Sequence, residues 1–250
     1  MKYEKIKYPD FQISAKITDF EDKVIKERIN NYEDLLFVRS LAEVCKNHNV
    51  QTELFIPCLF GQRSDRRFDK KQSFDLKIIT DIINSCNFRK VEILDPHSDV
   101  SLALINNSEK ISSFQYVQRA ITEIGSKDLV LVSPDAGAYK KVFEYASKLN
   151  LPVVAANKFR DLKGEIQLQF LGDVKGKDCL IVDDLCDGGR TFVTLADQLR
   201  IQGAEKVCLY ISHGYFSNGF DELKKTINHI YCTNSVKDIT DSYLTQYKII

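Results

Sequence analysis

Two adjacent carboxylates in front of a glycine-rich loop could together hold a sugar phosphate. Asp183 and Asp184 follow the apolar run 179–182, which is typical of a strand buried on both faces of a parallel sheet. Glycines behind them allow backbone N–H groups to turn toward a phosphate, and a carboxylate pair suits ribose hydroxyls or a magnesium ion. The alternative is an aspartate pair that only caps the next helix. The loop consists of Asp187, Gly188, Gly189, Arg190 and Thr191.

Elements of an α/β fold must position this loop. Phe192, Leu195 and Leu199 fall at helical spacing directly after it, so strand, loop and helix follow one another. A polar stretch at 105–115 predicts a boundary between a domain 1–112 and a domain 113–250. We expect short β structure within 1–30, strands at 52–59, 91–94, 129–132, 153–156, 179–182 and 207–211, and helices at 31–47, 75–86, 116–124 and 142–149.

Composition limits the classes of partner. The 35 basic and 35 acidic residues cancel, which argues against a nucleic-acid partner. No apolar run approaches the roughly 18 residues of a membrane span, and the first residues lack the apolar core of a signal peptide, so we expect no membrane partner. The seven scattered cysteines form no C-x-x-C pair and indicate reduced, mostly buried thiols in a cytoplasmic protein, with Cys186 inside the loop as the exception.

A charged loop follows the expected strand 52–59. It contains Arg63, Asp65 and Arg66 and is a candidate anion site, unless it is only a solvated loop. Its position matters because ligands of an open α/β sheet bind at the carboxyl ends of strands.

Polar residues also end three further strands. His97 follows 91–94, Asp135 follows 129–132, and Lys158 and Arg160 follow 153–156. A lone histidine is usually structural, and an exposed lysine–arginine pair is often only surface charge. The polar connection 161–169 could close over a substrate.

The loop segment VDDLCDGGRT resembles the ribose-5-phosphate loop, typically VDDxxDTGGT, of phosphoribosyltransferases and of phosphoribosyl pyrophosphate (PRPP) synthetases, also called ribose-phosphate pyrophosphokinases. Matches to the synthetases run from about residue 8 to residue 217 in family order. The charged loop resembles IPYFGYARQDRK, the histidine turn resembles Asp-Leu-His, and the Asp135 segment resembles SPDxGG. Lys158 and Arg160 match the family's Lys-x-Arg, and the segment 212–217 resembles THGVFS.

The resemblance implies two α/β domains of phosphoribosyltransferase type, each a mainly parallel sheet flanked by helices. The first would lie on the ATP-binding side, and the second would carry the ribose-phosphate loop. The implied reaction is transfer of the β,γ-diphosphate of ATP to the anomeric hydroxyl of ribose 5-phosphate, which gives PRPP and AMP. More distant alternatives are a catalytically inactive regulatory homologue and a transferase that consumes PRPP.

The resemblance also implies roles for the residues that match. Lys158 and Arg160 would be catalytic, and Asp183, Asp184 and the loop 187–191 would bind the ribose phosphate. Magnesium would be the metal cofactor, near His97 and Asp135. ATP would be bound by Tyr8, Asp10, Arg63, Asp65, Arg66 and His97.

Two departures from the family pattern affect assembly and substrate. The family completes its ATP site from a neighbouring subunit through Phe-x-Asp-Gly-Glu, which here becomes YPDFQ, so we expect a homodimer or higher homo-oligomer. In the ribose loop the first threonine becomes Gly188, and Arg190 adds a planar cation able to hold phosphate oxygens. We therefore also consider an acceptor with an extended 5-phosphate, such as ADP-ribose.

Overall fold

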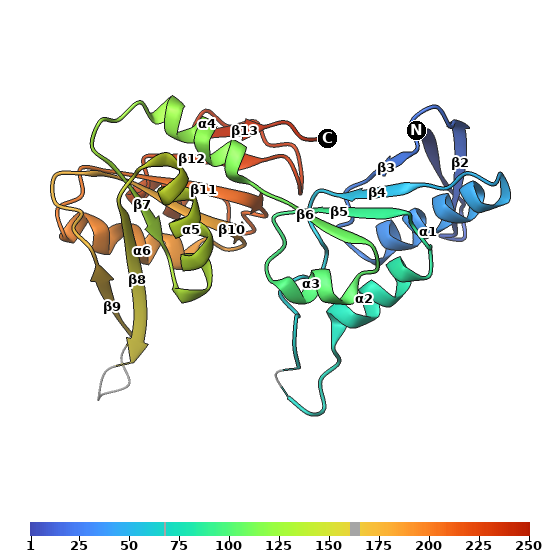
Figure 1. Ribbon diagram of the computed structural model, residues 1–250, viewed down its shortest axis with the longest axis horizontal. Helices are drawn as coiled ribbons and strands as arrows, with labels where there is room; N and C mark the ends of the chain where they lie inside the picture. The colour runs from blue at the N-terminus through green and yellow to red at the C-terminus, as the bar shows by residue number, and fades with distance from the viewer. Residues whose placement is uncertain (68, 161–165) are drawn as a thin grey trace. The chain divides into compact units, whose positions relative to one another are not determined.

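The computed structural model describes residues 1–67, 69–160 and 166–250, except the side chains of 158–160 and 166–168. The described chain divides into two compact units, Met1–Ser112 together with Ile250, and Ser113–Ile249. Each unit holds its own sheet, as Figure 1 shows. The expected α/β class, with mainly parallel sheets flanked by helices, is confirmed.

The first unit is built on a four-stranded parallel sheet in the order β3-β4-β5-β6. An antiparallel hairpin of β1 (Lys2–Lys7) and β2 (Ile13–Asp19) packs against α1. Figure 1 shows α2 and α3 on the same face of the sheet. The sheet strands are β3 (Val24–Lys26), β4 (Glu53–Ile56), β5 (Lys90–Leu94) and β6 (Ser108–Ile111), and the connecting helices are α1 (Tyr32–Asn47), α2 (Asp75–Asn84) and α3 (Asp99–Leu104).

The second unit is built on a seven-stranded sheet in the order β13-β12-β11-β10-β7-β8-β9. All neighbouring strands are parallel except β8 and β9. Its strands are β7 (Leu129–Ser133), β8 (Val153–Arg160), β9 (Ile166–Leu171), β10 (Asp178–Cys186), β11 (Lys206–Gly214), β12 (His229–Thr233) and β13 (Leu244–Tyr247). Its helices are α4 (Phe114–Ile124), α5 (Ala136–Leu149), α6 (Arg190–Ile201) and α7 (Asp221–Thr226).

Strand β10 lies between two hydrophobic cores. Ile181 joins the core that contains Leu195 of α6, whereas Leu180 joins the core that contains Val142 of α5. Successive side chains of a strand point to opposite faces, so one apolar run fills both cores. The burial of 179–182 on both faces is therefore confirmed.

The structure corrects the expected end of that strand. We placed Asp183 and Asp184 after a strand that ended at residue 182, but both lie inside β10, which continues to Cys186. The strand is longer because its pairing with β11 continues to Cys186↔Gly214. A neighbouring ladder of hydrogen bonds thus extends a strand beyond its apolar run.

Other elements were not expected from the pattern. The polar stretch 105–115 contains β6, which pairs in parallel with β5, and α3 precedes it. Strand β8 continues to Arg160 and pairs with β9 in the hairpin register Ala155↔Leu171, where we expected a polar connection at 161–169. Residues 161–165 lie outside the described part, so closure of this segment over a substrate stays a prediction.

Two further expectations concern the membrane and the cysteines. None of the described helices is long and apolar enough to cross a membrane. All seven cysteines are free thiols, and six of them are buried.

Helix α1 offers a test of the first unit's stability. The side chain of Asn31 accepts a hydrogen bond of 2.9 Å from the backbone N–H of Asp34 and so caps the helix. Asn31→Ala should lower the free energy of unfolding by about 1 kcal/mol, because an N–H of the first turn then loses its partner. Asn31→Ser restores a capping oxygen and should keep most of the stability. Equal stability of the alanine and serine variants in urea denaturation would contradict this.

Candidate functional site

The order of strands in the second unit creates a switch point between β7 and β10. From β7 the chain passes through α5 to β8 on one side, and after β9 it returns to β10 on the other side of β7. Ligands of such sheets bind outside the carboxyl ends of the strands at the switch point. Asp135 follows β7, and Asp183 and Asp184 lie near the end of β10. The topology therefore brings three of the expected site residues to one edge of one sheet.

Among the described strands, the last part of β10 has a partner on only one side. Its pairing with β7 ends at Ile181↔Val132, whereas its pairing with β11 continues beyond Asp183↔Ile211. The backbone of Asp183 and Asp184 is thus held from one side by β11. The other side is available to a ligand at the switch point.

The carboxylate pair is electrostatically strained. Asp184 is only 8% exposed, and its backbone N–H donates a hydrogen bond of 2.8 Å to Oδ1 of Asp183. Burial, and then the neighbouring charge of Asp184, raise the pKa of Asp183 well above its usual value, while Lys141 acts to lower it. A ligand that donates hydrogen bonds or positive charge would relieve this strain. Ribose hydroxyls or a magnesium ion would do so.

Lys141 was missed by the sequence analysis. It lies on α5, the helix that begins directly after Asp135, and its charge acts on Asp183. The sequence did contain an indication, because a helix that begins directly after a strand-end carboxylate has its first turns near the same end of the sheet. Lysine at a helical position is so common that its type alone gave no reason to select it.

The glycine loop ends at the start of helix α6. Gly189 is the N-cap residue with φ of 81°, and a Cβ there would lie 3.1 Å from the Leu223 side chain. No side chain caps the helix, so its first N–H groups can face an anion. Arg190 and Thr191, which we expected in the loop, are the first helical residues, and both are exposed.

The turn that follows β11 holds the glycine loop. Ser217 donates from its backbone N–H to the carbonyl oxygen of Asp187 at 3.1 Å and from its hydroxyl to Oδ1 of Asp187 at 2.7 Å. The side-chain amide of Asn218 donates to the carbonyl oxygen of Gly188 at 3.4 Å. The sequence analysis gave neither residue a role. The space beside Gly188 is occupied by Asn218, because a Cβ at Gly188 would lie 2.8 Å from the Asn218 amide nitrogen.

Two residues near the loop are structural. Cys186 is fully buried, and burial raises the pKa of its thiol to about 12, so it is not a thiolate nucleophile at neutral pH. His213 is also fully buried, and its Nδ1 lies 2.9 Å from the hydroxyl oxygen of Ser235.

The first unit brings its charged loop and the histidine turn together. They follow β4 and β5, which are neighbouring parallel strands, and Oε1 of Gln62 accepts a hydrogen bond of 2.9 Å from the backbone N–H of His97. Asp65 is buried, and Nε of Arg66 donates to it at 3.0 Å. Burial alone would raise the pKa of Asp65, but hydrogen bonding and the Arg66 charge hold it below its usual range. Arg63 and His97 are exposed.

Tyr8 and Asp10 lie at the tip of the β1–β2 hairpin, and both are exposed. The backbone N–H of Tyr8 donates to Gln12, and that of Phe11 donates to Tyr8, which closes the turn. Phe11 stands where the family motif has glycine, and it keeps a left-handed φ of 68° although it has a side chain. That side chain is 95% exposed. The hairpin therefore displays two aromatic residues instead of one.

Lys158 and Arg160 belong to the last part of β8, where their backbones pair with Leu168 and Ile166 of β9. Their side chains lie outside the described part of the structure. The neighbouring strand on the other side of β8 is β7, which precedes Asp135.

The expected magnesium residues, His97 and Asp135, belong to different units. The described residues contain no cluster of three or more His, Cys, Asp or Glu side chains that could hold a metal alone. Magnesium is usually bound by one or two carboxylates together with substrate phosphates, so a single exposed carboxylate fits this ion. Asp135 uses Oδ1 to accept a hydrogen bond of 2.9 Å from Ala138, which leaves its second oxygen for the cation.

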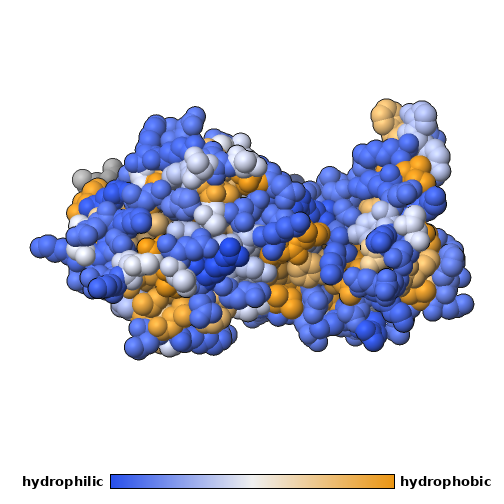
Figure 2. Space-filling view, turned by 90° about the horizontal axis from the view of Figure 1, so that it is seen from above, coloured by the Kyte–Doolittle hydropathy of each residue, from blue (hydrophilic) through white to orange (hydrophobic). Residues whose placement is uncertain are grey.

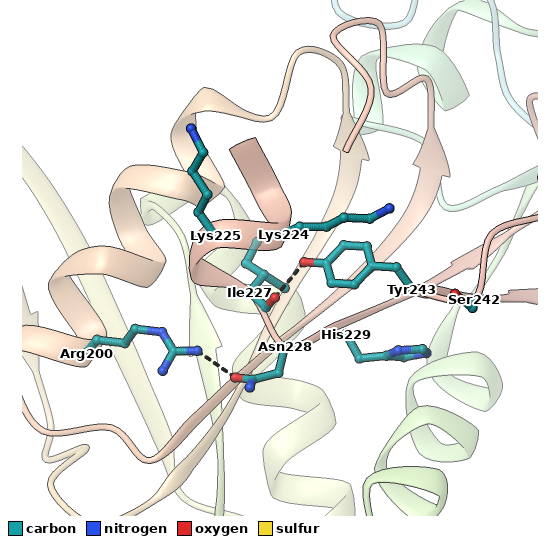
Figure 3. A pocket seen from close by; sticks show the side chains of 8 residues that line it. All are labelled: Arg200, Lys224, Lys225, Ile227, Asn228, His229, Ser242 and Tyr243. Carbon is teal, nitrogen blue, oxygen red and sulfur yellow. Dashed lines mark hydrogen bonds between the residues drawn. The ribbon is translucent and has the colours of Figure 1, made fainter. Parts of the chain in front are cut away.

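A hollow at the opposite edge of the second sheet, shown in Figure 3, does not belong to this site. It lies beside His229, the first residue of β12, and hence at the amino ends of the strands. The guanidinium of Arg200 is held by the carbonyl oxygen of Thr226 at 2.8 Å and by Asn228 at 2.7 Å. Lys224 and Lys225, also at the hollow, pair with carboxylates of Asp241 and Glu222. The Arg200 contact joins the end of α7 to α6, the Lys224 pair joins α7 to the segment before β13, and the Lys225 pair lies within α7.

The raised pKa of Asp183 predicts how stability depends on pH. A carboxyl group with a raised folded pKa stabilises the fold below its unfolded pKa of about 3.9, and this contribution is lost as pH rises through the folded value. Asp183→Asn removes the charge, so in chelator-containing buffer it should be measurably more stable than the parent at about pH 7.5. The difference should close toward about pH 4.

Asp197→Asn is the control, because Asp197 is an exposed carboxylate on α6 of the same unit. It should change thermal stability little at either pH. An Asp183→Asn variant whose stability advantage is the same at both pH values would contradict the assignment.

Comparison with known proteins agrees with this arrangement. Residues 106–245 match the family model of the phosphoribosyl transferase domain. The chain is 30% identical over 197 residues to a ribose-phosphate pyrophosphokinase of Mycoplasma genitalium, and the match covers 75% of this chain and 59% of that protein. It is 29% identical to ribose-phosphate pyrophosphokinase 2 of Saccharomyces cerevisiae, over 84% of this chain and 68% of that protein.

The solved structure of phosphoribosylpyrophosphate synthetase from Mycobacterium smegmatis has a similar fold. The TM-score is 0.85 at 19% identity, over 99% of this chain and 86% of that chain. The matched part spans about three fifths of the Mycoplasma genitalium relative. Taken with the ribose loop at the switch point, these matches show that the chain belongs to the phosphoribosyl transferase domain family, in its ribose-phosphate pyrophosphokinase branch.

Proposed function

We propose that this chain is an ATP-dependent pyrophosphokinase that transfers the β,γ-diphosphate of ATP to the anomeric hydroxyl of ribose 5-phosphate and gives PRPP and AMP. One observation carries the proposal. A strained carboxylate pair lies near the end of β10 at the switch point of the second sheet, and a glycine loop and an uncapped helix N-terminus follow that strand. The names of the curated relatives support the same reaction.

On the acceptor side, each part has a distinct task. The first N–H groups of α6 and the exposed Arg190 can bind the 5-phosphate. Asp183 and Asp184 can accept hydrogen bonds from the ribose hydroxyls, which fixes the position of the anomeric oxygen. Such positioning contributes strongly to phosphoryl transfer, because the enzyme must align the attacking oxygen with the phosphorus and the leaving group.

On the ATP side, the proposal rests on the matched residues of the first unit. The exposed Arg63 and the Arg66–Asp65 pair can hold phosphate and ribose groups of ATP, and the Gln62–His97 contact fixes the histidine turn beside them. Lys158 and Arg160 would place positive charge on the transferring diphosphate. Magnesium, when bound, would neutralise phosphate oxygens, and Asp135 of the second unit and His97 of the first are the residues that we propose for it, each in its own unit. The anomeric oxygen then attacks the β-phosphorus, and AMP leaves.

A second acceptor is kept for one reason. Arg190 is an exposed cation at the first position of α6, where it could hold the next phosphate of a 5-extended ribose such as ADP-ribose. Against this, the space beside Gly188 is filled by Asn218. We therefore propose ribose 5-phosphate as the main acceptor.

The free, largely buried thiols support function in a reducing compartment such as the cytoplasm.

The decisive experiment offers ATP and magnesium with ribose 5-phosphate or ADP-ribose and measures AMP and the product mass. We expect PRPP from ribose 5-phosphate, and a turnover at least ~100-fold lower for Lys158→Ala or Arg160→Ala at unchanged thermal stability, the scale of losing one transition-state donor. Near-normal turnover in both variants would refute their catalytic role. AMP release that is as fast with ADP-ribose as with ribose 5-phosphate would favour the extended acceptor. No AMP release with either acceptor would favour the inactive homologue.

The exposed hairpin predicts an oligomer. Two aromatic side chains, Tyr8 and Phe11, stand in water at the tip, and we propose that Tyr8 and Asp10 reach the ATP of a neighbouring subunit. Light scattering should show at least a homodimer. Tyr8→Ala should raise the KM for ATP several-fold and leave that for ribose 5-phosphate unchanged. Tyr32→Ala is the control, because Tyr32 is equally exposed but lies on α1. Full activity in a monomeric species would exclude the arrangement.

A further inference from the structure

The turn after β11 is built to present Asn218 to the glycine loop. Phe216 has a left-handed φ of 47°, its side chain is buried, and its ring lies 4.9 Å from the ring of Phe220. The turn is closed by a hydrogen bond of 3.0 Å from Gly219 to the carbonyl oxygen of Phe216. A strained residue persists in a folded protein only where surrounding contacts determine its conformation. The turn therefore holds the exposed residue 218 in a defined place.

The side chain of Asn218 occupies the position that a side chain at residue 188 would take. A Cβ on Gly188 would lie 2.8 Å from Nδ2 of Asn218, 3.5 Å from its Cγ and 3.8 Å from Oγ of Ser217. Residue 188 is the position at which the related ribose loops carry threonine. The loop of this chain has thus lost a side chain at the same place where the neighbouring turn supplies one.

The chemistry of the contact determines which end of the carboxamide faces the loop. The carbonyl oxygen of Gly188 can only accept, so the amide nitrogen of Asn218 must point to it, at 3.4 Å. An amide nitrogen has two N–H groups, and this long contact uses one of them. The second N–H can serve a ligand held at the start of α6.

We propose that Asn218 is a phosphate-binding residue of the acceptor site, whose carboxamide supplies the donor that Gly188 cannot supply. The inference rests on the proposed function and specifies it further: the ligand is a sugar phosphate monoester, and residues 188 and 218 act as one unit. A Cβ at position 188 would require the end of the exposed Asn218 side chain to shift. The two side chains therefore compete for one space, and a change at one position affects the other.

The first test is direct binding of ribose 5-phosphate by calorimetry, without ATP, which needs no catalysis. Asn218→Ala should weaken binding about ten-fold or more, as expected for loss of a hydrogen bond to a charged group. Asn218→Asp has the same shape but places a negative charge beside the phosphate, so it should weaken binding further. Free ribose, which lacks the phosphate, is the control ligand, and its affinity should not change in either variant.

The second test is a double-mutant cycle. Gly188→Thr alone should weaken binding, because the new side chain displaces the Asn218 carboxamide from its place beside the loop. Gly188→Thr combined with Asn218→Gly transfers the donor back to the loop and should bind ribose 5-phosphate better than either single variant. Additive losses in the cycle, or unchanged affinity in Asn218→Ala, would overturn the proposal.

Thermal unfolding separates binding from loop support. If Asn218 only supported the loop, Asn218→Ala would lower the melting temperature and weaken ribose and ribose 5-phosphate alike, and this outcome would also overturn the proposal. If the parent protein bound no ribose 5-phosphate and released no AMP, the proposed function itself would fail. If the parent protein binds ribose 5-phosphate and turns over, but the variants at position 218 bind it with unchanged affinity, only the present inference would fail.

Discussion

The second unit depends on the cost of holding two carboxylates together at the end of a largely buried strand. Asp183 and Asp184 are adjacent in a strand whose preceding residues are fully buried, and burial and mutual repulsion raise the pKa of Asp183. Such a pair persists only if the surrounding fold is stable enough to bear it. Two hydrophobic cores, one on each face of β10, provide that stability. The strain then favours binding of any ligand that offers hydroxyl donors or a cation at this edge.

The same constraint explains why β11 and its turn are so closely tied to β10. The pairing of β10 with β7 stops at Ile181, so among the described strands it is β11 that fixes the backbone of the carboxylates, and its pairing continues to Cys186. Beyond that point Tyr215 and Ser217 donate backbone hydrogen bonds to Cys186 and Asp187. These backbone hydrogen bonds hold the start of the loop in place, although the loop is not a strand of the sheet. One side of the strand stays open for a ligand, and the other is fixed, which is what an aligned phosphoryl transfer requires.

The limits of the sequence analysis follow from which interactions are local. The strand at 179–182, the helix within 31–47 and the helix after the glycines depend on spacing and nearby residue types, and these were predictable. The continuation of β10 and the existence of β6 depend on pairing with strands that are distant in sequence, which periodicity does not contain. Asn218 was missed for the same reason, because it approaches the loop only through tertiary structure, whereas Lys141 was missed because its residue type is too common on helices to select it.

Two altered motifs show how a change at one residue is balanced nearby in space. At the hairpin tip, Phe11 replaces glycine yet keeps the left-handed backbone, which for a residue with a Cβ costs roughly 1–2 kcal/mol. In the ribose loop, Gly188 replaces threonine, and Asn218 fills the vacated volume. In both cases the residue type departs from the family pattern, and the side chain that the motif displays changes with it. A comparison of motifs residue by residue would count both changes as losses. Binding of a phosphate or of another surface depends on the backbone of the motif and on any side chain that reaches the ligand, including one from a neighbouring segment.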